Sequence, residues 1–150
     1  QRAKIMTLHA PYDSDNIFAK ILRGELPNVT VYEDDVALAF MDVFPQTSGH
    51  TLVIPNGVEA SNFLDMPPER LGDYMERVQK VANAVERALS PDGIVVTQFN
   101  GAIAGQTVFH LHFHILPRNE GISQKAHASG EMADIAELES IANKIRQAIR

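Results

Sequence analysis

Residues 108–116 read VFHLHFHIL, and this stretch decides how the rest of the sequence is interpreted. Side chains two positions apart on a β-strand point to the same face. If 108–116 form a strand, His110, His112 and His114 therefore make one row of imidazoles. The opposite face, which can enter a core, then carries Phe109, Leu111, Phe113 and Ile115. Pro117 is expected to end this strand.

Four further strands are predicted upstream of this one. Residues 29–33 and 36–42 are apolar stretches on either side of the acidic turn Glu33-Asp34-Asp35, a pattern that indicates a hairpin. Residues 50–54 form a third apolar run, which Pro55-Asn56-Gly57 ends. Residues 94–99 form the fourth. Short turns join several of these runs, so we expect a five-stranded antiparallel sheet.

Three helices are predicted to pack on this sheet, which makes the fold class α+β. The first is short: Asp13 or Ser14 would cap it, and Gly24 would end it. The second runs from about residue 67 to 89, with apolar residues spaced by three or four along one stripe. That stripe is Leu71, Tyr74, Val78, Val81, Val85 and Leu89. The third is C-terminal and carries Ile135, Leu138, Ile141, Ile145 and Ile149 at the same spacing.

The chain is expected to hold one domain, residues 14–150, after a flexible leader of residues 1–13. Residues 1–5 precede Met6 and are expected to be an addition to the natural chain. The glycine-bounded segment 121–130 is expected to be a mobile loop.

Composition narrows the function classes. Of the 150 residues, 45% are hydrophobic and 21% charged, as in ordinary globular proteins. The net charge of −6 argues against a nucleic-acid polymer as partner, and no apolar run is long enough to span a bilayer. With no cysteine, disulfides and zinc–thiolate sites are excluded, which is consistent with a cytoplasmic location.

The histidine row allows three interpretations. It could be a polar sheet face without further function. It could bind a metal ion together with His50, although no carboxylate lies within the row. It could also attack phosphorus, because a neutral imidazole is a good nucleophile and the neighbouring rings can bind phosphoryl oxygens. The adjacent Gly105-Gln106-Thr107 favours the third interpretation, since it offers close backbone approach and hydrogen-bond donors.

The sequence resembles the histidine-triad (HIT) family, whose signature is His-φ-His-φ-His-φ-φ with φ apolar. Residues 110–116, HLHFHIL, match it in full. Further similar segments follow the family's order: residues 16–21, 31–35, 39–42 and 49–55. The chain is more similar to the Hint-like branch and its bacterial relatives than to the longer galactose-phosphate transferases. It lacks the cysteines through which some bacterial relatives bind structural zinc.

The resemblance implies a role for each matching residue. His112 would become transiently nucleotidylated, His114 and His50 would contact the phosphate region, and His110 would orient its neighbours. Asp42 would bind the ribose hydroxyls. The base pocket would be bordered by Val43, Phe18, Ile21 and Phe40. The phosphate and leaving group would meet Asn100, Gly105, Gln106 and Thr107.

The implied enzyme is a nucleotide hydrolase or transferase, of the phosphoramidase or dinucleoside polyphosphate hydrolase type. It would cleave a nucleoside 5′-monophosphate, with a purine base, from a P–N, P–O–P or acyl-phosphate linkage. The resemblance also implies a homodimer. No metal ion or other cofactor is expected. Two alternatives are a histidine-ligated metalloprotein and a nucleotide-binding module without catalysis.

Overall fold

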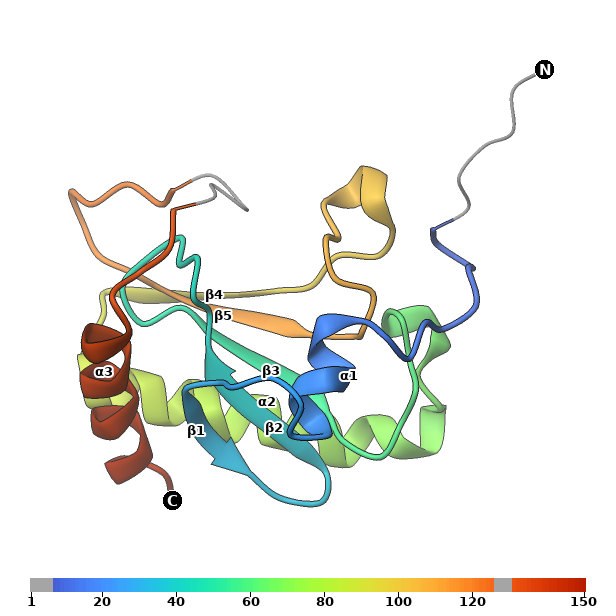
Figure 1. Ribbon diagram of the computed structural model, residues 1–150. Coiled ribbons are helices and arrows are strands. Elements are labelled where there is room, and N and C mark those ends of the chain that lie inside the picture. The colour runs from blue at the N-terminus through green and yellow to red at the C-terminus, as the bar shows by residue number, and fades with distance from the viewer. Residues whose placement is uncertain (1–6, 126–130) are drawn as a thin grey trace.

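The computed structural model describes residues 7–125 and 131–150, and its centre is one antiparallel sheet (Figure 1). The order across the sheet is β1-β2-β3-β5-β4, and every neighbouring pair is antiparallel. The five strands are β1 (Thr30–Glu33), β2 (Ala37–Met41), β3 (Thr51–Pro55), β4 (Gly93–Thr97) and β5 (Phe113–Arg118). The predicted hairpin, the five-stranded sheet and the α+β class are confirmed.

The two faces of the sheet are covered differently. Helices α2 (Pro68–Leu89) and α3 (Ile135–Gln147) pack on one face and form the main core with residues such as Val53 and Ile115. Helix α1 (Ile17–Leu22) contributes Phe18 to a smaller cluster that includes Phe40 and Leu52. The described residues also form two short 3-10 helices, η1 (Phe63–Asp65) and η2 (Ala102–Ala104). In the described ranges, no helix has both the length and the apolar character needed to cross a membrane.

Cross-strand register explains why the α1 face carries the imidazoles. Directly paired residues of neighbouring strands have their side chains on the same face of a sheet. Phe40 pairs with Leu52, Leu52 with His114, and His114 with Thr97. His114 therefore lies in one row with the apolar residues that α1 covers, while Phe113, which pairs with Val53, faces the main core.

Strand β5 begins later and ends later in the sequence than predicted. It begins at Phe113, because Val53↔Phe113 is its first pairing with β3 and the amide of Leu111 donates instead to Ala60. His110 and His112 thus precede the strand, and Phe109 lies outside the core. The strand continues through Pro117 to Arg118 along β4. β3 no longer pairs with it beyond Ile115, so the missing proline N–H is tolerated there.

One further expectation for the N-terminal region is corrected, and the described part of the leader makes contacts that the sequence does not predict. Asn16, rather than Asp13 or Ser14, caps α1: its side chain accepts from the amide of Ala19 at 2.9 Å. The described part of the leader is also attached to the domain. Leu8 O accepts from the side chain of Asn62 (2.9 Å), and Thr7 Oγ1 accepts from the amide of Ala102 (2.9 Å). Residues 1–6 and 126–130, within the predicted leader and mobile loop, lie outside the described residues.

Candidate active site

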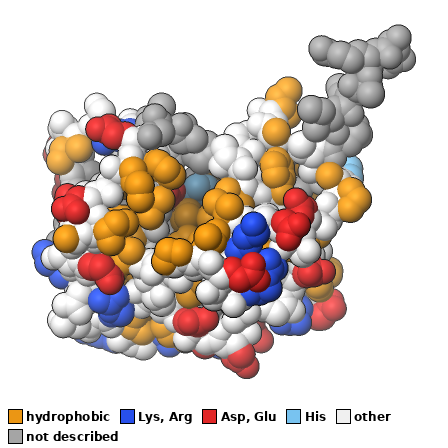
Figure 2. All heavy atoms as spheres, viewed as in Figure 1, with side chains coloured by type: hydrophobic (Ala, Val, Ile, Leu, Met, Phe, Trp, Pro, Cys, Tyr) orange, Lys and Arg blue, Asp and Glu red, His pale blue; other side chains and the backbone are white. Residues whose placement is uncertain are grey.

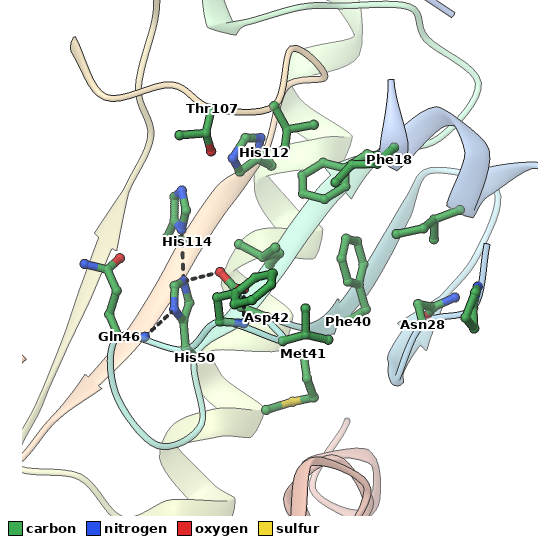
Figure 3. A pocket seen from close by; sticks show the side chains of 17 residues that line it. Phe18, Asn28, Phe40, Met41, Asp42, Gln46, His50, Thr107, His112 and His114 are labelled. Atoms are coloured by element: carbon green, nitrogen blue, oxygen red, sulfur yellow. Dashed lines mark hydrogen bonds and ion pairs between the residues drawn. The ribbon is translucent and has the colours of Figure 1, made fainter. Parts of the chain in front are cut away.

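A pocket opens on the α1 face of the sheet, between that helix, β2 and the segment 107–114. Hydrophobic side chains surround a hollow on this side of the molecule (Figure 2). Its apolar wall is formed by Ile17, Phe18, Ile21, Pro27, Phe40, Val43, Leu52 and Val108. Its polar end is formed by Asp42, His50, Thr107, His112 and His114 (Figure 3). One cavity therefore offers an apolar surface beside a cluster of imidazoles.

Hydrogen bonding fixes the tautomer of His112. Its Nδ1 lies 2.7 Å from the backbone carbonyl oxygen of His110. A carbonyl oxygen only accepts, so Nδ1 carries the proton and donates. In the neutral ring, the lone pair is then on Nε2. The edge of His112 meets Phe18 at a centroid distance of 5.0 Å and an interplanar angle of 88°. The ring is thereby held from two sides while it lines the pocket.

His50 and His114 form a directed pair at the polar end. The amide of Gln46 donates to His50 Nδ1 at 3.1 Å, so the proton of the neutral His50 ring is on Nε2. This Nε2–H donates to His114 Nδ1 at 2.9 Å. The proton of a neutral His114 is consequently on Nε2. The ring centroids of His112 and His114 are 4.9 Å apart, so the two rings lie next to each other in the pocket.

Asp42 follows the last residue of β2 and lines the same pocket. Its Oδ1 accepts from the amide of Phe44 at 2.8 Å, and its Oδ2 lies 3.5 Å from His50 Nε2. The carboxylate is therefore oriented by the backbone at the border between the imidazoles and the apolar wall.

His110 lies outside the pocket and is held in the interior. Its side chain is 1% exposed. Its Nε2–H donates to the carbonyl of Pro55 (3.1 Å), and the hydroxyl of Tyr12 donates to its Nδ1 (2.6 Å). Burial lowers the pKa of His110 to about 4, so the ring is neutral near pH 7. His110, the first histidine of the row, is thus a packed structural group, and its carbonyl accepts the hydrogen bond from His112 Nδ1.

The structure brings most of the predicted site residues together. Of the thirteen, nine line the pocket: Phe18, Ile21, Phe40, Asp42, Val43, His50, Thr107, His112 and His114. The other four are His110, Asn100, Gly105 and Gln106.

Two side chains predicted to meet the phosphate, Gln106 and Asn100, hydrogen-bond to backbone groups of the loop and of neighbouring residues. Gln106 Oε1 accepts from the amide of Gly101 (2.8 Å), and its Nε2 donates to the carbonyls of Ser61 (2.6 Å) and Val108 (3.0 Å). Asn100 Oδ1 accepts from the amide of Phe63 at 2.9 Å. Both side chains hold the loop in this structure, so their contact with a phosphate stays a prediction.

Gly105 is required by the loop itself. Its φ of +111° is a conformation that favours glycine, and a Cβ there would lie 3.5 Å from the ring of Phe99. The glycine therefore closes η2 whether or not its backbone also approaches a phosphate.

Two residues that hold the histidines in place were not expected from the sequence. Gln46 fixes the His50 tautomer through its amide and lines the pocket. Tyr12 contacts His110 although the two residues are 98 positions apart. A backbone amide in a turn and a contact between distant segments leave no periodic signal, so only the folded chain shows them.

Asp42, His50 and His114 are close enough to be considered as metal ligands, with donor atoms all within 4.8 Å. The hydrogen bonds argue against this use. A histidine that binds a metal through one nitrogen normally donates the N–H of the other. His50 Nδ1 instead accepts from the Gln46 amide, and His50 Nε2 donates directly to His114. This donor set does not fit a metal ion.

Comparison with known proteins gives concordant matches. The model of the HIT domain family matches residues 23–121. A solved HIT-like protein of Bartonella henselae, described as involved in cell-cycle regulation, is 50% identical. Its TM-score is 0.87, and the match covers 93% of this chain and all of that one.

Two more distant relatives differ in what their names state. The adenosine 5′-monophosphoramidase hnt1 of Schizosaccharomyces pombe is 40% identical over 68% of this chain and 73% of its own length. A zinc-bound histidine-triad family protein of Mycobacterium smegmatis is 32% identical, with a TM-score of 0.75. That match covers 89% of this chain and 92% of that chain.

Proposed function

Because the chain belongs to the histidine-triad (HIT) family, we propose that it is a nucleotide hydrolase or transferase that works through a nucleotidyl-histidine intermediate on His112. Its substrates carry a nucleoside 5′-monophosphate group in a P–N, P–O–P or acyl-phosphate linkage. The phosphoramidase named among its relatives supports the P–N case.

The observation that carries this proposal is the tautomer of His112. Donation from Nδ1 to the His110 carbonyl leaves a lone pair on Nε2, as attack on phosphorus requires. A positive charge that develops on the ring during attack is then stabilised by the same carbonyl.

The proposed reaction has two displacements. The lone pair of His112 Nε2 forms a bond to the α-phosphorus, and the bond from phosphorus to the leaving group breaks. His114, with its proton on Nε2, donates to the departing nitrogen or oxygen. Water then attacks the nucleotidyl-histidine, one proton of that water goes to His114 Nε2, and the nucleoside monophosphate departs with the lone pair of His112 restored. A second acceptor molecule in place of water makes the reaction a transfer.

The pocket supports a purine nucleotide as substrate. Phe18 and Phe40 meet edge to face, with centroids 5.3 Å apart, in the apolar wall suited to a flat base. Asp42 lies between this wall and the imidazoles, where ribose hydroxyls would come between base and phosphate. Charge-assisted hydrogen bonds from those hydroxyls to the carboxylate would orient the sugar.

We propose that residues 14–150 act as one domain and that two copies associate through β4. This strand is the last in the sheet order, and one of its edges is unpaired within the chain. Val95 and Val96 on it are 37% and 48% exposed. An exposed apolar edge strand is suited to pairing with a second sheet.

Two other functions use the same residues. A metalloprotein conflicts with the direction of the hydrogen bonds at His50, as argued above. A nucleotide-binding module without catalysis would need the pocket but not the His112 tautomer. The covalent intermediate therefore separates the proposal from both.

The test is to incubate the protein with adenosine phosphoramidate and measure the intact mass after a rapid quench at neutral pH. We expect an added adenylyl group on the wild type, located at His112 by fragmentation, and none on His112→Asn. Isothermal titration should show that His112→Asn still binds AMP. Turnover by His112→Asn near the wild-type rate contradicts the proposal. Binding of AMP without any adduct or turnover on a panel of substrates favours the binding module.

A further inference from the structure

Tyr12 connects the N-terminal segment to the residues just before β5, at a partly buried point. Its hydroxyl lies 2.6 Å from His110 Nδ1, and the two rings meet at 67° with centroids 5.7 Å apart. Because His110 Nε2–H donates to the Pro55 carbonyl, Nδ1 is an acceptor and the Tyr12 hydroxyl is the donor. The ring of His110 is thus held at both nitrogens.

The backbone of the same residue orients the nucleophile. The His110 carbonyl accepts from His112 Nδ1 at 2.7 Å. The next amide, that of Leu111, donates to the Ala60 carbonyl at 2.8 Å, which holds the peptide plane from the other side. A rotation of the 110–111 peptide would move the acceptor of the His112 proton. The side chain and backbone of His110 therefore transmit the position of Tyr12 to His112.

We propose that Tyr12 is a positioning residue for the reaction, acting through His110 on the tautomer and orientation of His112. This inference deepens the proposed function and rests on it. The leader, which the sequence predicts to be a flexible extension, would then contribute a residue that the reaction requires.

Other contacts of the same segment offer a matched control. Thr7 Oγ1 accepts from the amide of Ala102 at 2.9 Å, so Thr7 also ties the leader to the domain, through a hydrogen bond to Ala102 rather than to His110. If attachment of the leader alone matters, loss of either side chain should have the same effect. If Tyr12 acts as proposed, only its hydroxyl affects His112.

The experiment compares wild type, Tyr12→Phe and Thr7→Val. Tyr12→Phe keeps the ring but leaves the buried His110 Nδ1 without its donor. We expect the single-turnover rate constant for nucleotidylation of His112 to fall roughly 10- to 100-fold, since small displacements of a reacting group have effects of this size. The affinity for AMP should stay within about twofold, and Thr7→Val should keep the wild-type rate constant.

A second readout does not depend on activity. Long-range ¹H–¹⁵N spectra of protein labelled at histidine report which ring nitrogen carries the proton. We expect His112 to be a single Nδ1–H tautomer in wild type and Thr7→Val, and a mixture in Tyr12→Phe. The inference is overturned if Tyr12→Phe retains the wild-type rate constant and tautomers, or if Thr7→Val is slowed equally. A wild type that forms no adduct would refute the proposed function, while the spectra would still decide whether Tyr12 positions His112.

Discussion

His50 Nε2 lies 2.9 Å from His114 Nδ1, across 64 residues of sequence. The contact follows from the sheet: Leu52, two residues after His50, pairs directly with His114. The backbone amide of Gln46 gives the contact its direction, because it occupies the other nitrogen of His50. A turn that ends β2 and begins β3 thereby decides which nitrogen of His114 holds a proton.

The first prediction follows from that proton. His114→Ala should lower kcat/KM about 10²- to 10⁴-fold for an alkylamine phosphoramidate of AMP, whose nitrogen must be protonated as it leaves. For the p-nitrophenyl ester of AMP, which leaves as a stable anion, we expect a loss below about tenfold. Steady-state kinetics with the two substrates measure the difference. Equal losses for both would mean that His114 does not act as an acid.

Asp42 should recognise the ribose. Asp42→Asn keeps an oxygen for the Phe44 amide but removes the charge, so we expect affinity for AMP to fall about tenfold, the usual effect of one charge-assisted hydrogen bond. Binding of 2′,3′-dideoxy-AMP should change by less than about twofold, since it has no hydroxyl to lose. Calorimetric titration of both ligands into both proteins completes the cycle. A similar loss for the dideoxy ligand would assign Asp42 to the base or phosphate instead.

The edge of β4 should hold the homodimer together. A lysine on an edge strand opposes pairing, so Val96→Lys should sediment as a monomer at concentrations where the wild type sediments as a dimer. Leu64→Lys is the control, because Leu64 is 58% exposed and belongs to η1 rather than to β4. A wild type that stays monomeric up to about 100 μM would have a dimer dissociation constant above the micromolar values of specific complexes. That result would contradict this part of the proposal.

The spacing of apolar residues predicts the architecture because it reflects which side chains are buried. The alternation in 108–116 places Leu111 and Ile115 in the core and His114 on the pocket face, and the stripe from Leu71 to Leu89 gives α2 its buried side. The strand boundaries depend instead on where partners stop. The amide of Leu111 donates to the carbonyl of Ala60 rather than to β3, and the sequence of residues 108–112 does not predict this partner.

Capping shows a similar limit. Asp13, Ser14 and Asn16 are all residues that cap helices well, so their identity alone does not choose between them. In the fold, Asp13 accepts from the amide of Asp15 in the turn before α1, which leaves Asn16 to cap the helix. At the site, the resemblance supplies the residues, whereas the tautomers depend on Gln46 and Tyr12, which only tertiary structure brings near the histidines.

His110 should make folding stability depend on pH in a defined window. Burial lowers its pKa from 6.5 to about 4 in the folded chain. Between these values the unfolded chain binds a proton that the folded chain does not, so stability is lost as the pH falls through this range. The contribution should amount to about 2 kcal/mol between pH 7.5 and pH 5. The lowered pKa of Asp34 acts only below about pH 4 and stays outside the window.

The measurement is urea unfolding of wild type and His110→Gln at both pH values. His110→Gln is expected to be less stable overall because the Tyr12 and Pro55 contacts change, so the informative quantity is the difference in pH dependence between the two proteins. The change in the free energy of unfolding between pH 7.5 and pH 5 should be about 2 kcal/mol smaller in the variant than in the wild type. An NMR titration provides a second measurement: the His110 ring should remain neutral at pH 5 in the folded protein. A ring that protonates near pH 6.5 would show that the Tyr12–His110–Pro55 contact is open in solution, and both the pH dependence and the held position of His110 would then be lost.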